Sequence, residues 1–257
     1  MPEFIGNPQS AIRKAQEVRF DRVHRTRHAA GTAAQEVLRG VSLAIPAGQS
    51  VGVIGRSGGG KTTLLRLLTR LEDPDQGAIF YGGQDLRALD VIALRRRIAL
   101  VNQRSVMFPG SVLDNIMLPD ALTGRGPGDP ERARRALARV RLEAELAPRD
   151  AAALSVGQQG RVQLARSLYL DPEVVLLDES TANLDPKVAY EILDELHRWA
   201  ADEGRTLIHI SHEPDKLRRC ARLILLDEGR VTADGDAAAV LDDPRSPAAK
   251  ILASGGE

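Results

Sequence analysis

GRSGGGKT, at residues 55–62, is the stretch that decides how this chain folds. The apolar residues 51–54 precede it, and leucines at helical spacing follow it between residues 64 and 71. A strand, a glycine-rich loop and a helix in this order make G-x-x-x-x-G-K-[ST] a phosphate-binding loop. The glycines let several backbone N–H groups point at one phosphate chain, and the helix N-terminus adds the positive end of its dipole. The sequence therefore predicts a site for a nucleoside triphosphate.

Side chains within this phosphate loop have separate expected roles. Lys61 brings a positive charge to the β- and γ-phosphates, and the Thr62 hydroxyl is placed to hold Mg²⁺. The alternative is an ordinary glycine-rich turn, which the flanking strand and helix disfavour. The residues predicted to bind the nucleotide are Gly55, Arg56, Ser57, Gly58, Gly59, Gly60, Lys61, Thr62 and Thr63.

The composition narrows the class of protein. The chain has 257 residues, of which 43% are hydrophobic, enough for one large domain or two small ones with a buried core. Its 35 basic and 35 acidic residues balance, so we expect no nucleic-acid partner. The single cysteine, Cys220, excludes an internal disulfide and suits a reducing cytoplasm. We expect neither a signal peptide nor a membrane span, which needs roughly 20 apolar residues.

Short aliphatic strands alternate with helical patterns along most of the chain. This alternation favours an α/β fold with a parallel sheet that is covered on both faces. Apolar residues from Val18 to Ile45 predict a small antiparallel sheet, and the strandless stretch after residue 104 predicts a helical insertion. The expected strands are residues 50–54, 98–101, 174–177, 206–210 and 223–226, and the expected helices are residues 61–71, 130–140, 157–170, 186–203 and 213–219.

Two carboxylates end the expected strand at residues 174–177. Asp178 is placed to reach Mg²⁺ through water. Glu179 lies one residue further, so its side chain points elsewhere and can orient or deprotonate an attacking water. The alternative is a charged pair at a helix start, which the aliphatic strand before it disfavours.

Further motifs complete a recognisable series. Gln103 follows the strand at residues 98–101, LSVGQ occupies residues 154–158, STANLD occupies residues 180–185, and His212 follows the strand at residues 206–210. Together with the phosphate loop and the two carboxylates, this order resembles the ATPase subunits of ABC transporters. The resemblance covers roughly residues 18–236, nearly the whole chain.

The resemblance implies a P-loop ABC ATPase fold, which has a RecA-like parallel core, an N-terminal antiparallel β subdomain and an inserted α-helical subdomain. On this basis residues 18–236 form a single ATPase domain, with the helical subdomain at about residues 104–170. Residues 1–17 are an N-terminal extension, and residues 237–257 are a short C-terminal helical tail.

The resemblance also implies ATP and Mg²⁺ as cofactors and a homodimer as the working form. Each ATP would lie between the phosphate loop of one subunit and residues 154–158 of the other, which we call the signature segment. Asp185 would cross the dimer interface. The catalytic residues would be Glu179, His212 and Gln103, the metal ligands Thr62, Gln103 and Asp178, and the residues acting in trans Ser155, Val156, Gly157 and Gln158.

This sequence departs from the family pattern at three places. Val156 stands in the signature segment where the family usually has glycine, and Ser180 stands where proline is usual. The family usually stacks an aromatic side chain on adenine, whereas alignment of the first strand puts Arg27 or His28 there. Guanidinium or imidazole stacking is physically reasonable. A solvent-facing basic loop is an equally supported alternative.

The expected partners are separate integral-membrane permease subunits, which would hold the chain at the cytoplasmic face of the inner (plasma) membrane. Residues 90–97 and 103–115 are similar to bacterial-type ATPases that pair with small permeases in iron export and plant aluminium tolerance. Metal or small-solute export is therefore favoured, and a phosphate-type importer ATPase is the next alternative. A soluble ABC ATPase without transport, such as an iron–sulfur assembly factor, also remains open.

Other side chains allow more than one interpretation. Met107 and Phe108, in an apolar stretch after Gln103, could line a groove for a permease helix or fill the core of the helical subdomain. His209 is expected to be a core histidine with satisfied hydrogen bonds, and His197 a surface residue. The arginines beside Cys220 could lower its pKa, although an unreactive thiol is the favoured interpretation.

Overall fold

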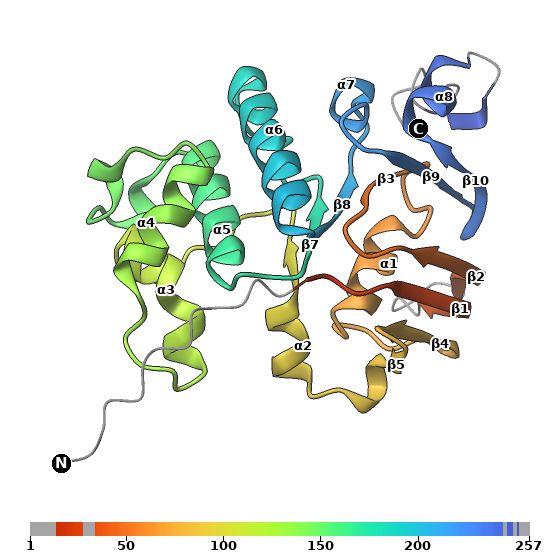
Figure 1. Ribbon diagram of the computed structural model, residues 1–257, viewed down its shortest axis with the longest axis horizontal. Coiled ribbons are helices and arrows are strands. Elements are labelled where there is room, and N and C mark those ends of the chain that lie inside the picture. Colours follow the sequence, from red (N-terminus) through yellow and green to blue (C-terminus); the bar gives the residue numbers. More distant parts are fainter. Residues whose placement is uncertain (1–13, 28–33, 244–245, 249–250, 252–257) are drawn as a thin grey trace.

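The computed structural model describes residues 14–27, 34–243, 246–248 and 251. Its larger sheet has the strand order β10-β9-β3-β8-β7-β6, in which every strand is parallel to its neighbours except β10. The predicted parallel α/β core is therefore present (Figure 1). The strands of this sheet are β3 (Ser50–Ile54), β6 (Ile98–Val101), β7 (Val174–Asp178), β8 (Thr206–Ile210), β9 (Arg222–Asp227) and β10 (Arg230–Asp236).

The smaller sheet is antiparallel and has the order β2-β1-β4-β5. It contains the predicted N-terminal strands, and it also recruits residues 76–85, which come after the first helix. Val18 in β1 pairs with Ile45 on one side and with Tyr81 on the other. The strands are β1 (Val18–Arg27), β2 (Gln35–Ile45), β4 (Gln76–Tyr81) and β5 (Gln84–Asp85).

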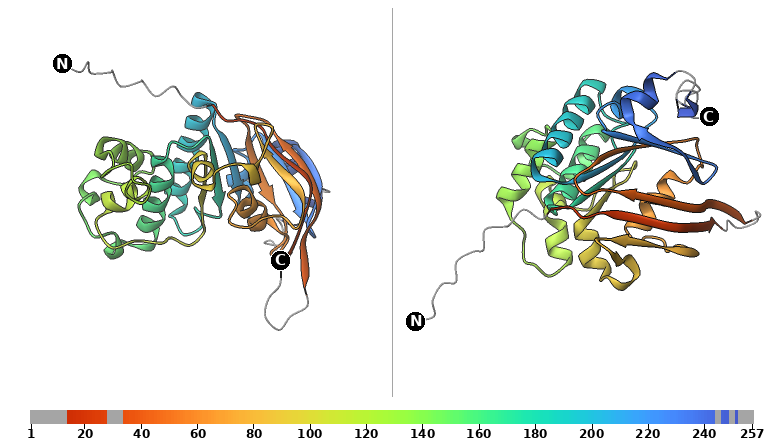
Figure 2. Two further views of the ribbon diagram at one scale, coloured as in Figure 1. Left: turned by 90° about the horizontal axis from the view of Figure 1, so that it is seen from below. Right: turned by 45° about the vertical axis from the view of Figure 1, so that its right-hand side comes forward.

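The helices form two groups. Helices α3, α4 and α5 lie together on one side of the molecule, and the two sheets lie on the other (Figure 2). These three helices fall within the predicted insertion. The helices are α1 (Lys61–Leu68), α2 (Val91–Arg97), α3 (Val112–Leu122), α4 (Pro130–Arg139), α5 (Val156–Tyr169), α6 (Pro186–Glu203), α7 (Pro214–Leu217) and α8 (Ala237–Asp242).

Local sequence explains where the helices of the insertion begin. Ser111 and Asp114 form a reciprocal capping box at the start of α3, so two backbone N–H groups at that end find acceptors. Asp129 caps α4, and Pro130 occupies its first turn, where no intrahelical N–H bond is lost. Residues 123–129, which contain three glycines and Pro127, form the loop between these two helices.

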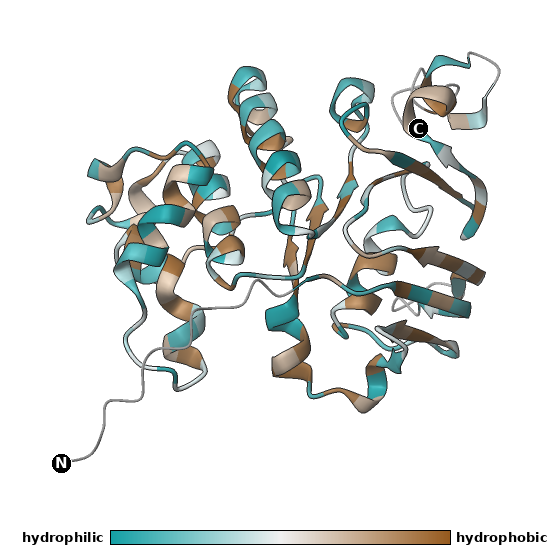
Figure 3. Ribbon diagram, viewed as in Figure 1, coloured by the Kyte–Doolittle hydropathy of each residue, from teal (hydrophilic) through white to brown (hydrophobic). Residues whose placement is uncertain are grey.

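The core is divided by the parallel sheet. One cluster packs the antiparallel sheet and α1 against one face, and a second packs α6 and the helical insertion against the other. All residues of β7 and β8 are buried, which explains their nearly continuous apolar sequences. In Figure 3 the central strands are mostly brown, whereas α6 alternates between teal and brown as expected for a one-sided helix.

Several predicted element ends were wrong by a few residues. Helix α1 ends at Leu68, because Arg70 adopts a positive φ of 50° and turns the chain. Helix α5 begins one residue earlier than predicted, at Val156, because Ser155 caps it. Helix α7 spans only Pro214–Leu217, and β7 continues through Asp178.

Candidate nucleotide site

The phosphate loop joins β3 to α1, and two of its glycines cannot be replaced without a clash. A Cβ at Gly55 would lie 1.8 Å from the carbonyl oxygen of Leu226, and a Cβ at Gly60 would lie 2.5 Å from that of Val37. Gly60 also has a φ of 98° as the N-cap of α1. A Cβ at Gly58 would meet nothing within 4 Å, so this part of the loop leaves open space. The loop therefore packs against Leu226 and Val37 at Gly55 and Gly60, and it is open at Gly58.

Lys61 is 6% exposed and is held inside the loop. Its Nζ donates to the carbonyl oxygens of Gly55 at 2.7 Å and of Arg56 at 2.8 Å. Burial lowers its pKa, while the carboxylates of Glu179 and Asp178 oppose that effect. The ammonium group therefore lies where a phosphate anion would stabilise its charge.

Thr62 and Asp178 meet across the site as predicted for a metal-binding pair. The Thr62 hydroxyl donates to Oδ1 of Asp178 at 3.2 Å. Asp178 is 7% exposed, and burial raises the pKa of its carboxyl group. Hydroxyl and carboxylate oxygens are the donors that Mg²⁺ prefers. The residues present therefore fit this ion.

Glu179 sits between the two other predicted catalytic side chains. Its Oε1 lies 2.9 Å from Nε2 of His212, and its Oε2 accepts from Nε2 of Gln103 at 3.2 Å. Its backbone is left-handed, with a φ of 49°, and its N–H donates to the carbonyl oxygen of Ile210 at the end of β8. Such a conformation costs about 1–3 kcal/mol and persists only where the surroundings enforce it. The surrounding structure therefore holds this carboxylate in place at a cost in folding free energy.

The sheet order explains why these residues come together. Strands β3, β8, β7 and β6 are adjacent and parallel, so their carboxyl ends form one edge. The phosphate loop, His212, the pair Asp178 and Glu179, and Gln103 follow these four strands in turn. An open cavity of about 580 Å³ lies beside them and is lined by Thr62, Arg66, Leu71, Glu72, Asn102, Gln103, Arg104, Val106 and Asp178.

Arg66 and Glu72 line this cavity although sequence reasoning did not select them. They form an ion pair at 3.3 Å. Arg66 lies four residues after Thr62 in α1, and residues four apart share a helix face. That spacing was a signal that could have identified Arg66.

The signature segment forms the start of α5. The Ser155 hydroxyl accepts from the N–H of Gln158 at 3.3 Å, and the Gln158 side chain accepts from the N–H of Ser155 at 3.0 Å. Val156 is 63% exposed. A Cβ at Gly157 would lie 3.3 Å from the carbonyl oxygen of Asn183. These four residues do not line the cavity beside Thr62, so the chain does not bring its own signature segment onto that cavity.

Asp185 and Arg27 have partners within the chain. The Asp185 carboxylate accepts from two backbone N–H groups in the first turn of α6 and caps that helix. The Arg27 guanidinium donates to the Thr63 hydroxyl at 2.9 Å and lies 4.0 Å from Glu72. His28, the other residue proposed for adenine stacking, lies outside the described residues.

Two expectations about other side chains were wrong, for His197 and His209, whereas the favoured interpretation of Cys220 as an unreactive thiol is confirmed. His197 is not a surface residue, because its Nε2 is buried. His209 is fully buried, but neither ring nitrogen has a hydrogen-bond partner among the described residues. Burial raises the pKa of Cys220 to about 11, so the neighbouring arginines do not activate this thiol.

The fold and the site define a member of the ABC transporter family. The family model described as "ABC transporter" matches residues 38–182, which is more than half of the chain. The chain therefore belongs to this family. ATPase domains of this family hydrolyse ATP with Mg²⁺. The predicted ATPase activity and the predicted ATP and Mg²⁺ cofactors are therefore confirmed for this domain.

Curated relatives with related sequences come from plants and bacteria. The chain is 40% identical to Protein STAR1 of Oryza sativa subsp. japonica over 86% of its own length and 63% of that protein. It is 40% identical to ABC transporter I family member 17 of Arabidopsis thaliana, over 80% of the chain and 76% of that protein. It is 42% identical to the methionine import ATP-binding protein MetN of Caulobacter vibrioides, over 83% of the chain and 66% of that protein. The chain thus spans less than two thirds of the length of the first and third of these relatives.

Solved structures agree with the cassette fold. A dimeric ATP-binding cassette in a post-hydrolysis state, bound to ADP and Pi, matches with a TM-score of 0.78 and 29% identity over 86% of this chain and 98% of that one. A bacterial Atm1-family ABC exporter with ATP bound matches with a TM-score of 0.81 and 28% identity, over 99% of this chain and 44% of that one. The predicted α/β cassette is therefore confirmed.

Proposed function

We propose that this chain is the ATP-binding subunit of an ABC transporter and that it works as a homodimer closed by ATP. The observation that carries the proposal is the separation of two half-sites within one chain. The phosphate loop, Asp178 and Glu179 form one half, and the exposed start of α5 forms the other. A second copy would supply the signature segment that the first copy does not bring to its own cavity. The dimeric state of the related cassette supports this arrangement.

The residues of the first half-site have separable tasks in hydrolysis. Lys61 and the backbone N–H groups of the loop would hold the phosphates, and Thr62 and Asp178 would hold Mg²⁺, with Gln103 beside them. Bound Mg²⁺ would neutralise charge on the β- and γ-phosphate oxygens. Glu179 would accept the proton of the attacking water, and His212 at 2.9 Å would fix the carboxylate and contact the γ-phosphate.

The second half-site acts through a helix N-terminus. The capping box at Ser155 and Gln158 satisfies two polar groups at this end, and the remaining N–H groups of the first turn can face an anion. Val156 occupies the exposed position where the family usually has glycine. We propose that the backbone approaches the γ-phosphate at Gly157 instead.

The surface after Gln103 is suited to a permease. Phe108 is 42% exposed and lies 5.2 Å from the guanidinium of Arg166, and Val106 is 56% exposed. Met107 packs against the core of the helical insertion, so it serves the core rather than a docking groove. Phe108 and Val106 are therefore the residues we propose to contact a short cytoplasmic helix of the membrane partner.

The membrane location would come from that partner. Among the described residues, no helix is long and apolar enough to cross a bilayer. We propose that the subunit lies peripherally on the cytoplasmic face of the inner (plasma) membrane, bound to separate permease subunits.

The cargo we propose is a small solute or metal ion, and we favour export from the similarity of residues 90–97 and 103–115 to bacterial-type export ATPases. Small-solute import is the second candidate, because several relatives are named methionine import ATP-binding proteins.

Phe108→Ala tests the permease contact. The isolated subunit should keep its melting temperature and ATP binding, because the side chain is 42% exposed and is not part of the buried core, yet it should lose copurification with a polytopic membrane protein. Leu122→Ala, at a side chain that is 73% exposed, is the matched control and should copurify normally. If the wild-type chain hydrolyses ATP but copurifies with no membrane protein, a soluble non-transport ABC ATPase is the better description.

A further inference from the structure

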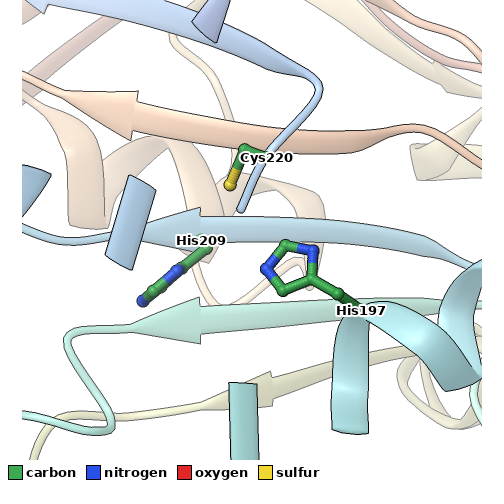
Figure 4. Close-up of side chains that lie close together, drawn as sticks. All are labelled: His197, His209 and Cys220. Carbon is green, nitrogen blue, oxygen red and sulfur yellow. The ribbon is translucent and has the colours of Figure 1, made fainter. Parts of the chain in front are cut away.

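Three side chains with metal-binding atoms lie together outside the nucleotide site. His197 comes from α6, His209 from β8 and Cys220 from the turn before β9. Figure 4 shows the sulfur and both rings gathered between these elements. One ligand atom from each residue lies within 4.8 Å of the others.

His209 is the least expected member of this cluster. Its side chain is 0% exposed, and within the described part of the chain neither Nδ1 nor Nε2 has a hydrogen-bond partner. A buried polar ring without a partner is costly, so such groups usually bind something. Its neighbour in β3 is Gly52, where a Cβ would lie 3.4 Å from Sγ of Cys220. The same Cβ would lie 2.8 Å from the Leu223 side chain, so only a glycine lets this strand pack so closely beside the thiol.

His197 is oriented as metal-binding histidines commonly are. Its Nδ1 is hydrogen-bonded to the Ser50 hydroxyl at 2.9 Å, and its Nε2 is buried and without a partner among the described residues. When one ring nitrogen donates to a neighbouring group, the other keeps its lone pair for a metal. The Ser50 hydroxyl can accept from Nδ1 when that atom carries the proton, and this tautomer leaves the Nε2 lone pair for a metal.

Protonation states agree with this arrangement. Burial lowers the pKa of His197 to about 4 and that of His209 to about 3, so both rings are neutral at pH 7 and able to bind a metal. Burial raises the pKa of Cys220 to about 11, so the thiol keeps its proton until a cation displaces it. Metal binding would therefore release one proton per chain.

We propose that His197, His209 and Cys220 form a buried site for a thiophilic metal ion, and that the ion it binds best is Cu⁺. A thiolate with two imidazoles is a donor set that selects copper or zinc. Cu⁺ with one thiolate and two neutral imidazoles has no net charge, which suits a buried position near Lys216 and Arg219. Zn²⁺ would leave a positive charge there, and structural zinc sites almost always have four ligands.

The distances allow an ion after a small adjustment. Metal–nitrogen bonds of roughly 2.0 Å and metal–sulfur bonds of roughly 2.3 Å place ligand atoms about 3.3–3.8 Å apart. The cluster therefore has to close by at most about 1.5 Å, starting from separations within 4.8 Å. A bound ion would fasten α6, β8 and the turn before β9 to one another.

The test is a titration of the reduced, metal-free chain with Cu⁺ against a coloured Cu⁺ chelator. We expect one ion per chain, with one sulfur and two nitrogen ligands in the X-ray absorption spectrum. Cys220→Ser and His209→Gln should each lose this binding. His24→Gln is the matched control, because His24 is a half-buried histidine paired with Glu36 outside the cluster, and it should bind like the wild type.

Two further measurements keep the proposal open to refutation if a variant fails to fold. Cys220 is the sole cysteine, so a maleimide reports on this site alone, and Cu⁺ should slow its reaction in the wild-type chain at least tenfold. A parallel titration with Zn²⁺ should show weaker binding, and tighter zinc binding would overturn the copper preference. Absence of Cu⁺ uptake by the wild type, as expected if a buried water fills the cluster, would overturn the site itself. Uptake that survives in folded Cys220→Ser would do the same.

Discussion

The phosphate loop and the signature segment both present a helix N-terminus, yet their surroundings differ. Lys61, at the start of α1, is 6% exposed and bonded to carbonyl oxygens of its own loop. Val156, at the start of α5, is 63% exposed. The start of α1 is therefore enclosed by the fold, whereas the start of α5 is exposed. We propose that the chain itself completes the surroundings of the first helix start, and that the second helix start contacts a second copy.

The largest expected effect concerns the closed half-site. Glu179→Gln should lower the rate of ATP hydrolysis about 10²–10⁴-fold, because an amide cannot accept the proton of the attacking water. ATP binding should persist, since Lys61 and the loop are unchanged. Phosphate release and equilibrium nucleotide binding measure the two properties. Glu145→Gln, at an exposed glutamate, is the control. Near wild-type turnover in Glu179→Gln would remove the carboxylate from its assigned role.

Lys61→Ala should weaken ATP binding at least about 10–100-fold, because a hydrogen bond to a charged group contributes roughly 1.5–3 kcal/mol. Lys187→Ala, at an exposed lysine of α6, should bind ATP normally. A nucleotide titration compares the two variants. Equal affinities would mean that the buried ammonium group does not contact the phosphates.

Val156→Asp tests the exposed start of α5 by adding a negative charge there. The side chain is exposed, and a carboxylate in the first turn of a helix is compatible with the helix dipole, so the fold should remain stable. The negative charge should repel a γ-phosphate held by the second copy and reduce ATP-dependent dimerisation about tenfold or more, an effect of roughly 1.4 kcal/mol. Monomer binding of ATP should not change. Leu122→Asp, at another exposed apolar residue of the helical insertion, should dimerise like the wild type.

The smallest expected effect concerns Arg27. If its guanidinium stacks on adenine, Arg27→Ala should raise the KM for ATP with little change in kcat, an effect of roughly 0.5–2 kcal/mol. Arg27→Tyr should restore the affinity. The Arg27 guanidinium also donates to the Thr63 hydroxyl, so Thr63→Val, which removes this bond and keeps the guanidinium, should raise the KM less than Arg27→Ala does if stacking is the main contribution. An unchanged KM in Arg27→Ala would place adenine elsewhere.

Local patterns predicted the secondary structure around the phosphate loop and around Asp178 and Glu179. The apolar strand before Gly55, the glycines and Lys61 are contiguous in sequence, so one short stretch specifies the loop. Asp178 ends β7 and Glu179 follows it; all five residues of this strand are buried, as the aliphatic run at residues 174–177 predicts. Parallel strand order then brings separately recognisable segments to one edge.

Features that depend on distant pairing were not predictable in the same way. Residues 76–85 join the antiparallel sheet only because β4 pairs with β1 across the chain. The left-handed backbone of Glu179 depends on its bond to the end of β8. The burial of His197 did have a signal, since it lies four residues after Leu193 on the apolar face of α6. The side chains of Met107 and Phe108 point to different environments, which composition alone does not distinguish.

Light scattering of the Glu179→Gln chain tests the central claim most directly, because this variant should bind ATP without consuming it. The chain has a mass of 27.8 kDa. We expect a monomer without nucleotide and a dimer with ATP and Mg²⁺, with one ATP per chain. Adding Val156→Asp to the same chain should weaken the dimer about tenfold or more. A Glu179→Gln chain that stays monomeric at saturating ATP, or a dimer that Val156→Asp does not weaken, would contradict the account of two half-sites completed by a second copy.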